Sequence, residues 1–285
     1  MSQSLELKTF SESDIIPLFE AFSLAFSAND VPFRPSLEQF RNRIFRKLGI
    51  VNEVSGLLTS GSMVVAFVLH TINRNGNKLT AYNGGTGVIP YYRGNGHAIE
   101  VYSWLFPKLQ NLGVNNILLE VIDNNQRAIE LYKKMGFNFV RTFKCFKLTS
   151  TIPNYHVDEL IIAEAKQWNS GYAVFDSYET SFLDSIPHLQ TSFDNETMLI
   201  SSIDDQVVGY VIFQSALGRI SRLAVMEHFR GKHVASALVR EVQKRSFSNE
   251  ITIMNVPEDQ QGTIQALQKM GFVNEVDQIE MELII

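Results

Sequence analysis

The stretch VIPYYRGNGHAIEVY, Val88 to Tyr102, runs from an apolar pair into two spaced glycines and then into a helical pattern. A strand that leads through such glycines into a helix presents several backbone N–H groups at the positive end of that helix. Glycine at 94 and 96 removes side chains where an anion must approach the main chain, and Arg93 adds a mobile cation that can pair with phosphate oxygens. The stretch therefore predicts a phosphate site, and a diphosphate fits it.

Two segments of the chain recur in the same order in its two halves. The glycine stretch GVIPYYRGNGHAIEVYSWL at 87–105 corresponds to LAVMEHFRGKHVASALVRE at 223–241. Further along, LYKKMGFNFV at 131–140 corresponds to LQKMGFVNEV at 267–276. Shared order over such a distance indicates a duplicated domain.

The length of 285 residues also favours two domains, since it exceeds the usual size of one compact domain. We expect domains at 1–150 and 151–285, with the boundary near TSTIPNY at 149–155. Each half shows strands followed by helices in the same order, which predicts an α+β fold. Each domain should be a mixed, mostly antiparallel twisted sheet flanked by helices.

Apolar runs and turn residues predict the individual elements. In the first half we expect strands at 54–61, 63–72, 79–89, 115–122, 139–143 and 144–149, and helices from about 95 and at 124–135. In the second half we expect strands at 195–202, 206–213, 218–225, 251–256 and 278–285, and helices at 234–244 and 260–270. Val101, Tyr102 and Leu105 should form the buried stripe of the first of these helices, which Pro107 should kink or shorten.

Composition places the chain among folded globular proteins, with 45% hydrophobic and 19% charged residues. A single cysteine, Cys145, rules out an intrachain disulfide framework, and no His/Cys cluster has zinc spacing. The start lacks the pattern of a signal peptide, and no run approaches the length of a membrane span. We expect a cytoplasmic protein without metal or membrane contact.

Charge is distributed unevenly around the net value of −5. Residues 1–150 hold 16 Lys and Arg against 11 Asp and Glu, whereas residues 151–285 hold 9 against 19. An acidic second half attracts a cationic substrate or partner, or is simply a solvated surface. Neither half suggests a nucleic acid partner.

The pattern Arg93-x-x-Gly96-x-Ala98 resembles the signature with which the GNAT acetyltransferase superfamily holds the pyrophosphate of coenzyme A. LEVIDNNQRAIELYKKMGF at 119–137 is similar to the later strand and helix of that superfamily. The resemblance implies acetyl-CoA as co-substrate, an acyltransferase activity, and tandem domains. The implied cofactor contacts are Val88, Ile89, Arg93, Gly94, Asn95, Gly96, His97, Ala98, Asn125 and Ala128.

Two further residues take catalytic roles in this resemblance. Asn125, Ile129 and Tyr132 share one helix face, and in the superfamily the tyrosine protonates or hydrogen-bonds the departing sulfur while the asparagine steadies the pantetheine arm. A thiolate leaving group has a pKa of about 8.5 and a phenol a pKa of about 10, so Tyr132 can supply a proton or a hydrogen bond without being ionised at neutral pH. Glu120 stands where relatives similar to ribosomal-protein alanine acetyltransferases keep a base; other members use a different residue or a water chain.

The second copy departs from this pattern. His233 stands in place of Gly96, where an imidazole should crowd or reshape the phosphate approach, and Leu267 stands in place of Tyr132. Gln260 and Thr263 replace Asn125 and Ala128. We therefore expect an active first domain and a degenerate second domain, which either binds coenzyme A weakly or is structural.

The predicted function is acetyl transfer from acetyl-CoA to a primary amine, with backbone donors at Val88 to Pro90 polarising the thioester carbonyl. The alternative is a module that binds acyl-CoA or mediates assembly without turnover. The segment at 23–50 should line the acceptor side, and its Phe and Arg content suits an aromatic small molecule or a peptide terminus. The acceptor and the oligomeric state stay open.

Overall fold

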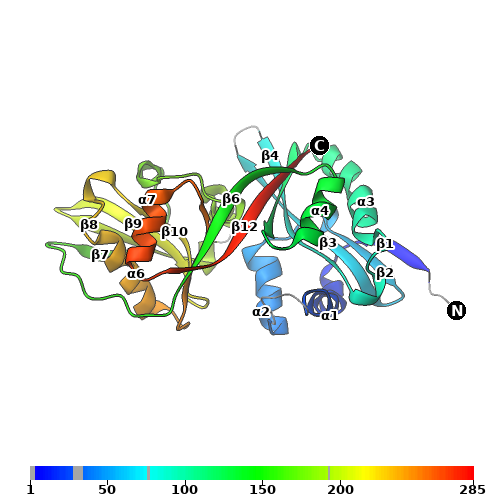
Figure 1. The fold of residues 1–285 in the computed structure, drawn as a ribbon, viewed down its shortest axis with the longest axis horizontal. Coiled ribbons are helices and arrows are strands. Elements are labelled where there is room, and N and C mark those ends of the chain that lie inside the picture. The colour runs from blue at the N-terminus through cyan, green and yellow to red at the C-terminus, as the bar shows by residue number, and fades with distance from the viewer. Residues whose placement is uncertain (1–3, 28–34, 76–77, 192) are drawn as a thin grey trace. The chain divides into compact units, whose positions relative to one another are not determined.

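The structure is a computed structural model that describes residues 4–27, 35–75, 78–191 and 193–285 (Figure 1). Its elements fall into two compact units. Unit 1 consists of Met1–Glu120, Arg127–Phe139 and Met281–Ile285, and unit 2 consists of Val121–Gln126 and Val140–Glu280. Each unit therefore contains segments from both halves of the sequence.

Within the described residues, unit 1 is built on five neighbouring strands, four α-helices and short segments of 3-10 or π-helix. The strands are β1 (Leu5–Thr9), β2 (Gly56–Ser60), β3 (Met63–Asn75), β4 (Lys78–Val88) and β5 (Asn116–Ile122), in that order across the sheet. All neighbours run antiparallel except the parallel pair β4 and β5. The helices are α1 (Ile15–Phe26), α2 (Leu37–Arg41), α3 (His97–Asn111) and α4 (Gln126–Lys134). These short segments are Glu12–Asp14, Asn42–Lys47, Asn52–Val54 and Pro90–Tyr92.

Unit 2 repeats this plan. Its sheet has the order β6 (Asn138–Leu148), β11 (Ile251–Pro257), β10 (Arg219–Val225), β9 (Gln206–Gln214), β8 (Thr197–Ile203) and β7 (Ile161–Ala165). Only β10 and β11 run parallel. The helices are α5 (Ile186–Thr191), α6 (Val234–Arg245) and α7 (Gln261–Lys269), and β12 (Val273–Ile284) is the last strand. The short turns are Ser170–Phe175, Phe182–Asp184, Phe193–Asn195 and Glu227–Phe229.

The predicted α+β class, with a mixed and mostly antiparallel sheet and helices in each unit, is confirmed. The prediction of two separate strands at 139–149 was wrong, because Asn138–Leu148 is one continuous strand that pairs antiparallel with β11. β1 and β7 were not predicted, since five-residue edge strands carry little periodicity.

Helix α3 packs into the core of unit 1 through the predicted stripe. Val101, Tyr102 and Leu105 are all fully buried. A side chain added at Gly56 on β2 would meet Val101 at 2.9 Å, so glycine permits the close approach of helix and strand. Pro107 does not shorten the helix, which continues to Asn111. The helix surface around Pro107 is buried through Leu105 and Leu109, and this packing outweighs one lost backbone hydrogen bond.

Strand β9 carries the core of unit 2 on both faces, as expected for a central strand whose side chains alternate. Val211 and Phe213 pack in one apolar cluster with residues of α6 such as Leu238. Tyr210 and Ile212 pack in a second cluster with Phe175 and Leu189. Unit 2 therefore has an apolar layer on each side of its sheet.

Candidate active site

The paired part of β4 and β5 is short. Their parallel ladder covers three residue pairs, from Thr80 with Asn116 to Tyr82 with Leu118. On its other side, β4 has an extra residue, because Leu69 pairs with Gly85 and His70 pairs with Asn83. The residue between them, Gly84, is a β-bulge, a feature that re-aims side chains and is frequent at active sites.

The loop between β4 and α3 has the geometry of an anion site. Gly94 and Gly96 have φ of +86° and +79°, a region that favours glycine, and Gly96 is the N-cap of α3. A Cβ built on either glycine meets nothing within 4 Å. The first N–H groups of α3 lack partners within the helix. The loop thus fits a phosphate group that approaches the main chain.

Arg93 is fixed against the main chain by two hydrogen bonds. Its Nε donates to the carbonyl of Val88 at 3.0 Å, and its Nη2 donates to the carbonyl of Ala25 at 2.7 Å. The expectation of a mobile cation is therefore wrong: the guanidinium holds the end of β4 to the end of α1. A contact between Arg93 and a phosphate stays a prediction.

The expected set of backbone donors at the end of β4 needs a correction. The N–H of Ile89 already donates to the carbonyl of Val65 at 3.0 Å, and Pro90 has no N–H. Ile89 is also buried. Of the three residues, Val88 alone is left as a candidate donor to a thioester carbonyl.

Tyr132 lies in a buried polar cluster that includes the bulge. Its side chain is 8% exposed, and its ring packs edge-on against Phe137 with the ring centroids 5.6 Å apart. Burial raises the pKa of Tyr132 above its usual value near 10, while hydrogen bonding with Thr86 and Asn83 lowers that pKa in part. The phenol is therefore protonated at neutral pH and contacts residues of the bulge.

Glu120, the candidate base, is half-buried near the end of β5. Tyr82 on β4 donates its hydroxyl hydrogen bond to Oε2 of Glu120 at 3.0 Å. The first half of the sequence thus holds one carboxylate and one phenol on neighbouring elements of a single unit. A carboxylate can accept a proton, and a phenol can donate one.

The other predicted contact residues lie along the loop and beside α4. Asn95 donates to the carbonyl of Tyr92 at 3.3 Å, and the Nδ1 of His97 lies 3.1 Å from Glu100. Ala98 is buried in the first turn of α3. Asn125 is exposed and precedes α4, which begins at Gln126, whereas Ala128 is half-buried within the helix.

The polar residues around the bulge were not among the predicted site residues. Asn83 donates to Thr86 at 2.8 Å and also to the hydroxyl of Tyr102. Tyr102 was expected only as part of a buried stripe. The pair Gly84–Gly85 inside a strand was the available signal, because glycine there often marks a bulge.

Unit 2 keeps the backbone of the same site. Its β10–β11 ladder covers two pairs, and Ser221 is the bulge residue of β10. Gly231 has φ of +76°, and His233, the N-cap of α6, has φ of +62°. Arg230 donates to two carbonyls, those of Val225 and Phe175. The replacement of glycine by His233 has therefore left the left-handed conformation of the loop intact.

The side chains of unit 2 differ from those of unit 1. The imidazole of His233 stacks on the ring of Tyr155 at 4.0 Å between centroids. A small recess of about 20 Å³, partly open to solvent, lies where β10 and β11 diverge. Its lining includes Tyr178, Ser221 and Leu267, the last of which stands at the position of Tyr132. This recess presents an alkyl group where unit 1 has a phenol.

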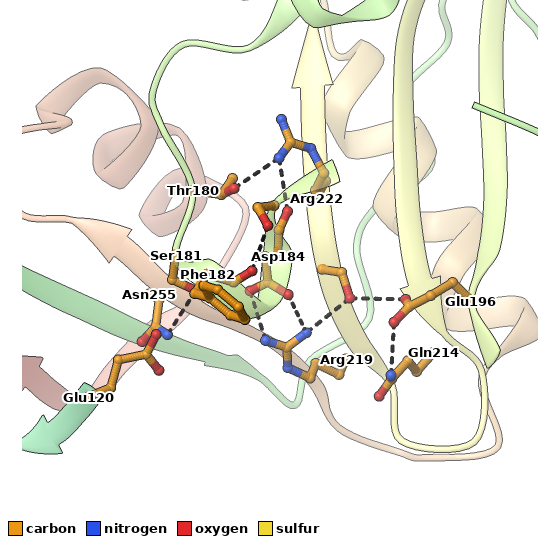
Figure 2. A network of polar contacts seen from close by, with 12 residues as sticks. Glu120, Thr180, Ser181, Phe182, Asp184, Glu196, Gln214, Arg219, Arg222 and Asn255 are labelled. Carbon is orange, nitrogen blue, oxygen red and sulfur yellow. Dashed lines mark hydrogen bonds and ion pairs between the residues drawn. The ribbon is translucent and has the colours of Figure 1, made fainter. Parts of the chain in front are cut away.

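A network of charged side chains supports the recess (Figure 2). Arg219 donates to both carboxylate oxygens of Asp184 at 2.8 Å and to Ser221 at 2.9 Å. Ser221 donates to Glu196 at 3.0 Å, and Gln214 donates to the same carboxylate. Asp184 and Glu196 are buried, so their charges depend on these partners.

Comparison with known proteins places these features in a family. The model of the acetyltransferase (GNAT) family matches residues 20–137 and 162–272, one segment in each half of the sequence. The matched segments cover more than half of the chain, and the chain therefore belongs to the GNAT acetyltransferase family. No curated protein matches the sequence.

Solved structures share the fold over the whole chain. A GCN5-related N-acetyltransferase from Sphaerobacter thermophilus has 16% identity and a TM-score of 0.74, with 98% of this chain and 95% of that chain covered. A putative acetyltransferase from Pyrococcus horikoshii has 16% identity and a TM-score of 0.74, with 99% and 90% covered. A tandem GNAT protein of the clavulanic acid biosynthesis pathway has 12% identity and a TM-score of 0.74, with 99% and 98% covered. The chain thus has the tandem GNAT arrangement.

Within 4–27, 35–75, 78–191 and 193–285, no group of three or more His, Cys, Asp or Glu side chains is placed to hold a metal ion. Over the same ranges, every helix is too short or too polar to cross a membrane.

Proposed function

We propose that the first half of the chain transfers an acetyl group from acetyl-CoA to a primary amine. The observation that carries this proposal is the pairing, in one unit, of a bare glycine loop at the start of α3 with a buried phenol against the β4 bulge. Gly94, Asn95, Gly96 and the first turn of α3 would hold the pyrophosphate. The division into an active half up to residue 150 and a degenerate half after it stays a prediction.

Acetyl-CoA supplies an activated carbonyl carbon and a thiol leaving group. Tyr132 would give its proton at Oη to that sulfur, and Glu120 would take the surplus proton of the amine. Val88 would donate its N–H to the carbonyl oxygen as charge develops there. The chain's part in the reaction is then two proton transfers and one oriented backbone donor.

The acceptor amine is not specified by these residues. The segment at 23–50, expected on the acceptor side, includes residues 28–34, which lie outside the described part of the chain. An aromatic small molecule and a peptide terminus remain the two proposed acceptor classes. A panel of such amines, assayed by thiol release from acetyl-CoA, tests the proposal directly; thiol release at the background rate with every amine would refute it.

Glu120→Gln is expected to lower kcat by about 10-fold to 100-fold and to leave the KM for acetyl-CoA unchanged. Glutamine keeps an acceptor for the Tyr82 hydroxyl but takes up no proton. The deficit should narrow at high pH, where the amine loses its proton without a base. Equal kcat values for variant and wild type at pH 7 would assign the base to a water chain instead.

Gly96→Ala should weaken coenzyme A binding by about 10-fold to 100-fold, as measured by calorimetry, because its Cβ occupies the space of a phosphate. Gly113→Ala is the matched control: Gly113 has φ of +77° and an equally open surround, at the other end of α3. Both variants should lose about 1–2 kcal/mol of stability from backbone strain. If Gly96→Ala and Gly113→Ala bind coenzyme A with the same affinity, the loop is not part of the cofactor site.

A second candidate function is acyl-CoA binding without turnover in the second half. The retained left-handed backbone of the loop at Gly231 and His233 favours it. Calorimetry on Gly96→Ala separates the two functions: binding that persists at one site per chain, with transfer lost, would place a non-catalytic site in the second half. Complete loss of binding would leave that half with a structural role.

A further inference from the structure

The buried cluster around Tyr132 contains two phenols and one shared pair of polar side chains. Asn83 donates to Thr86 at 2.8 Å and to the hydroxyl of Tyr102, and Thr86 lies 3.5 Å from that hydroxyl. Thr86 and Asn83 also act on Tyr132, since hydrogen bonding with both lowers the pKa of its phenol in part. The amide of Asn83 is itself fixed, because its Oδ1 accepts the N–H of Gly85 at 2.9 Å. The bulge therefore places two donors, the amide of Asn83 and the hydroxyl of Thr86, beside the phenols of Tyr102 and Tyr132.

Tyr102 comes from α3 and is fully buried. Its ring packs edge-on against Phe137, with centroids 6.1 Å apart, and Phe137 packs in the same way against Tyr132. On its other side lies His70, with ring centroids 5.6 Å apart. Burial lowers the pKa of His70 to about 4, so this neighbour is neutral at physiological pH. The cluster thus gathers hydroxyl and amide groups without adding charge.

We propose that Thr86 and Tyr102 are positioning residues for the Tyr132 phenol, holding it at the bulge and stabilising the phenolate it becomes after giving up its proton. This inference rests on the proposed function of Tyr132. As the amine nitrogen bonds to the carbonyl carbon, the electron pair of the carbon–sulfur bond goes to sulfur. Tyr132 Oη passes its proton to that sulfur and regains one from solvent. A phenolate buried at this place needs donors, and the hydroxyl and amide groups of the cluster are those donors.

Thr86→Val tests this arrangement, because valine has nearly the shape of threonine without its hydroxyl. We expect about a tenfold loss in kcat with an unchanged KM for acetyl-CoA, and recovery of kcat in Thr86→Ser. Tyr102→Phe should show the same loss. Tyr172→Phe, at a half-buried tyrosine of unit 2, is the control for removal of a hydroxyl and should leave kcat unchanged.

A double-mutant cycle separates positioning from general stability. In the Tyr132→Phe background, Thr86→Val and Tyr102→Phe should each change kcat by less than about twofold, because the group on which they act is gone. A full tenfold loss in that background would overturn the inference and leave the proposed function standing. If Tyr132→Phe itself has wild-type kcat, the proposed role of Tyr132 fails first, and the inference falls with it.

Discussion

Tyr132→Phe is expected to lower kcat for acetyl transfer by about 10²-fold to 10⁴-fold, with the KM for acetyl-CoA within about twofold of wild type. The substitution removes the proton that the phenol would give to sulfur and keeps the ring that packs on Phe137. Steady-state thiol release with the best amine of the panel measures both constants. Because burial raises the pKa of Tyr132, the phenol should stay protonated up to about pH 10. The kcat of the wild type should therefore not fall below that pH through ionisation of Tyr132.

The control for this experiment is again Tyr172→Phe, which removes a hydroxyl in unit 2. Thermal unfolding of both variants shows whether the fold is kept. A Tyr132→Phe protein that folds and retains wild-type kcat would exclude the phenol as the acid. In that case the donor to sulfur would have to be sought elsewhere, for example in a bound water.

Arg219→Met is expected to destabilise unit 2 by about 3–5 kcal/mol. Arg219 donates to both oxygens of Asp184, whose side chain is 3% exposed, and it also donates to Ser221. Methionine fills much of the same volume but leaves a buried carboxylate without this cation. Denaturant unfolding followed by the fluorescence of Trp168, in a Trp104→Phe background, reports on unit 2.

Two comparisons make this result specific. Arg245→Met breaks an exposed pair with Glu164, whose side chains are 38% and 61% exposed, and should cost less than about 1 kcal/mol. Adding Asp184→Leu to Arg219→Met should restore much of the stability, since the unpaired charge is then removed. If Arg219→Met lowers the free energy of unfolding by no more than Arg245→Met does, the Arg219–Asp184 pair contributes no more than a surface contact.

The repeated motifs were sufficient to predict the α+β fold and its duplication. The KMGF copies and the two glycine segments mark the same strand-to-helix positions in both halves, and the glycine φ values follow directly from that role. What could not be predicted is how segments are shared between units. Val140 to Leu148 pair with β11 in unit 2, and local periodicity contains no information about such a partner.

Gly94 and Gly96 were predicted from the conformational freedom of glycine, and Tyr132 and Glu120 from the resemblance to the superfamily. Their roles stay predictions to be tested. The state of Arg93 was not predictable, because its partners are main-chain carbonyls that any sequence supplies. The contact between Thr86 and Tyr102 could not be predicted either, because it depends on a bulge that shifts the register of β4.

The assignment of Met281–Ile285 to unit 1 has a consequence for biosynthesis. The N–H of Ile285 donates to the carbonyl of Asn115 at 3.1 Å, and Asn116 and Lys78 both reach Glu282. Translation from residue 150 to residue 285 adds 135 residues, which takes on the order of ten seconds. During that interval the nascent first half lacks its final contacts. A chain cut between the repeats would lack these contacts permanently, so the first half depends on being joined to the second.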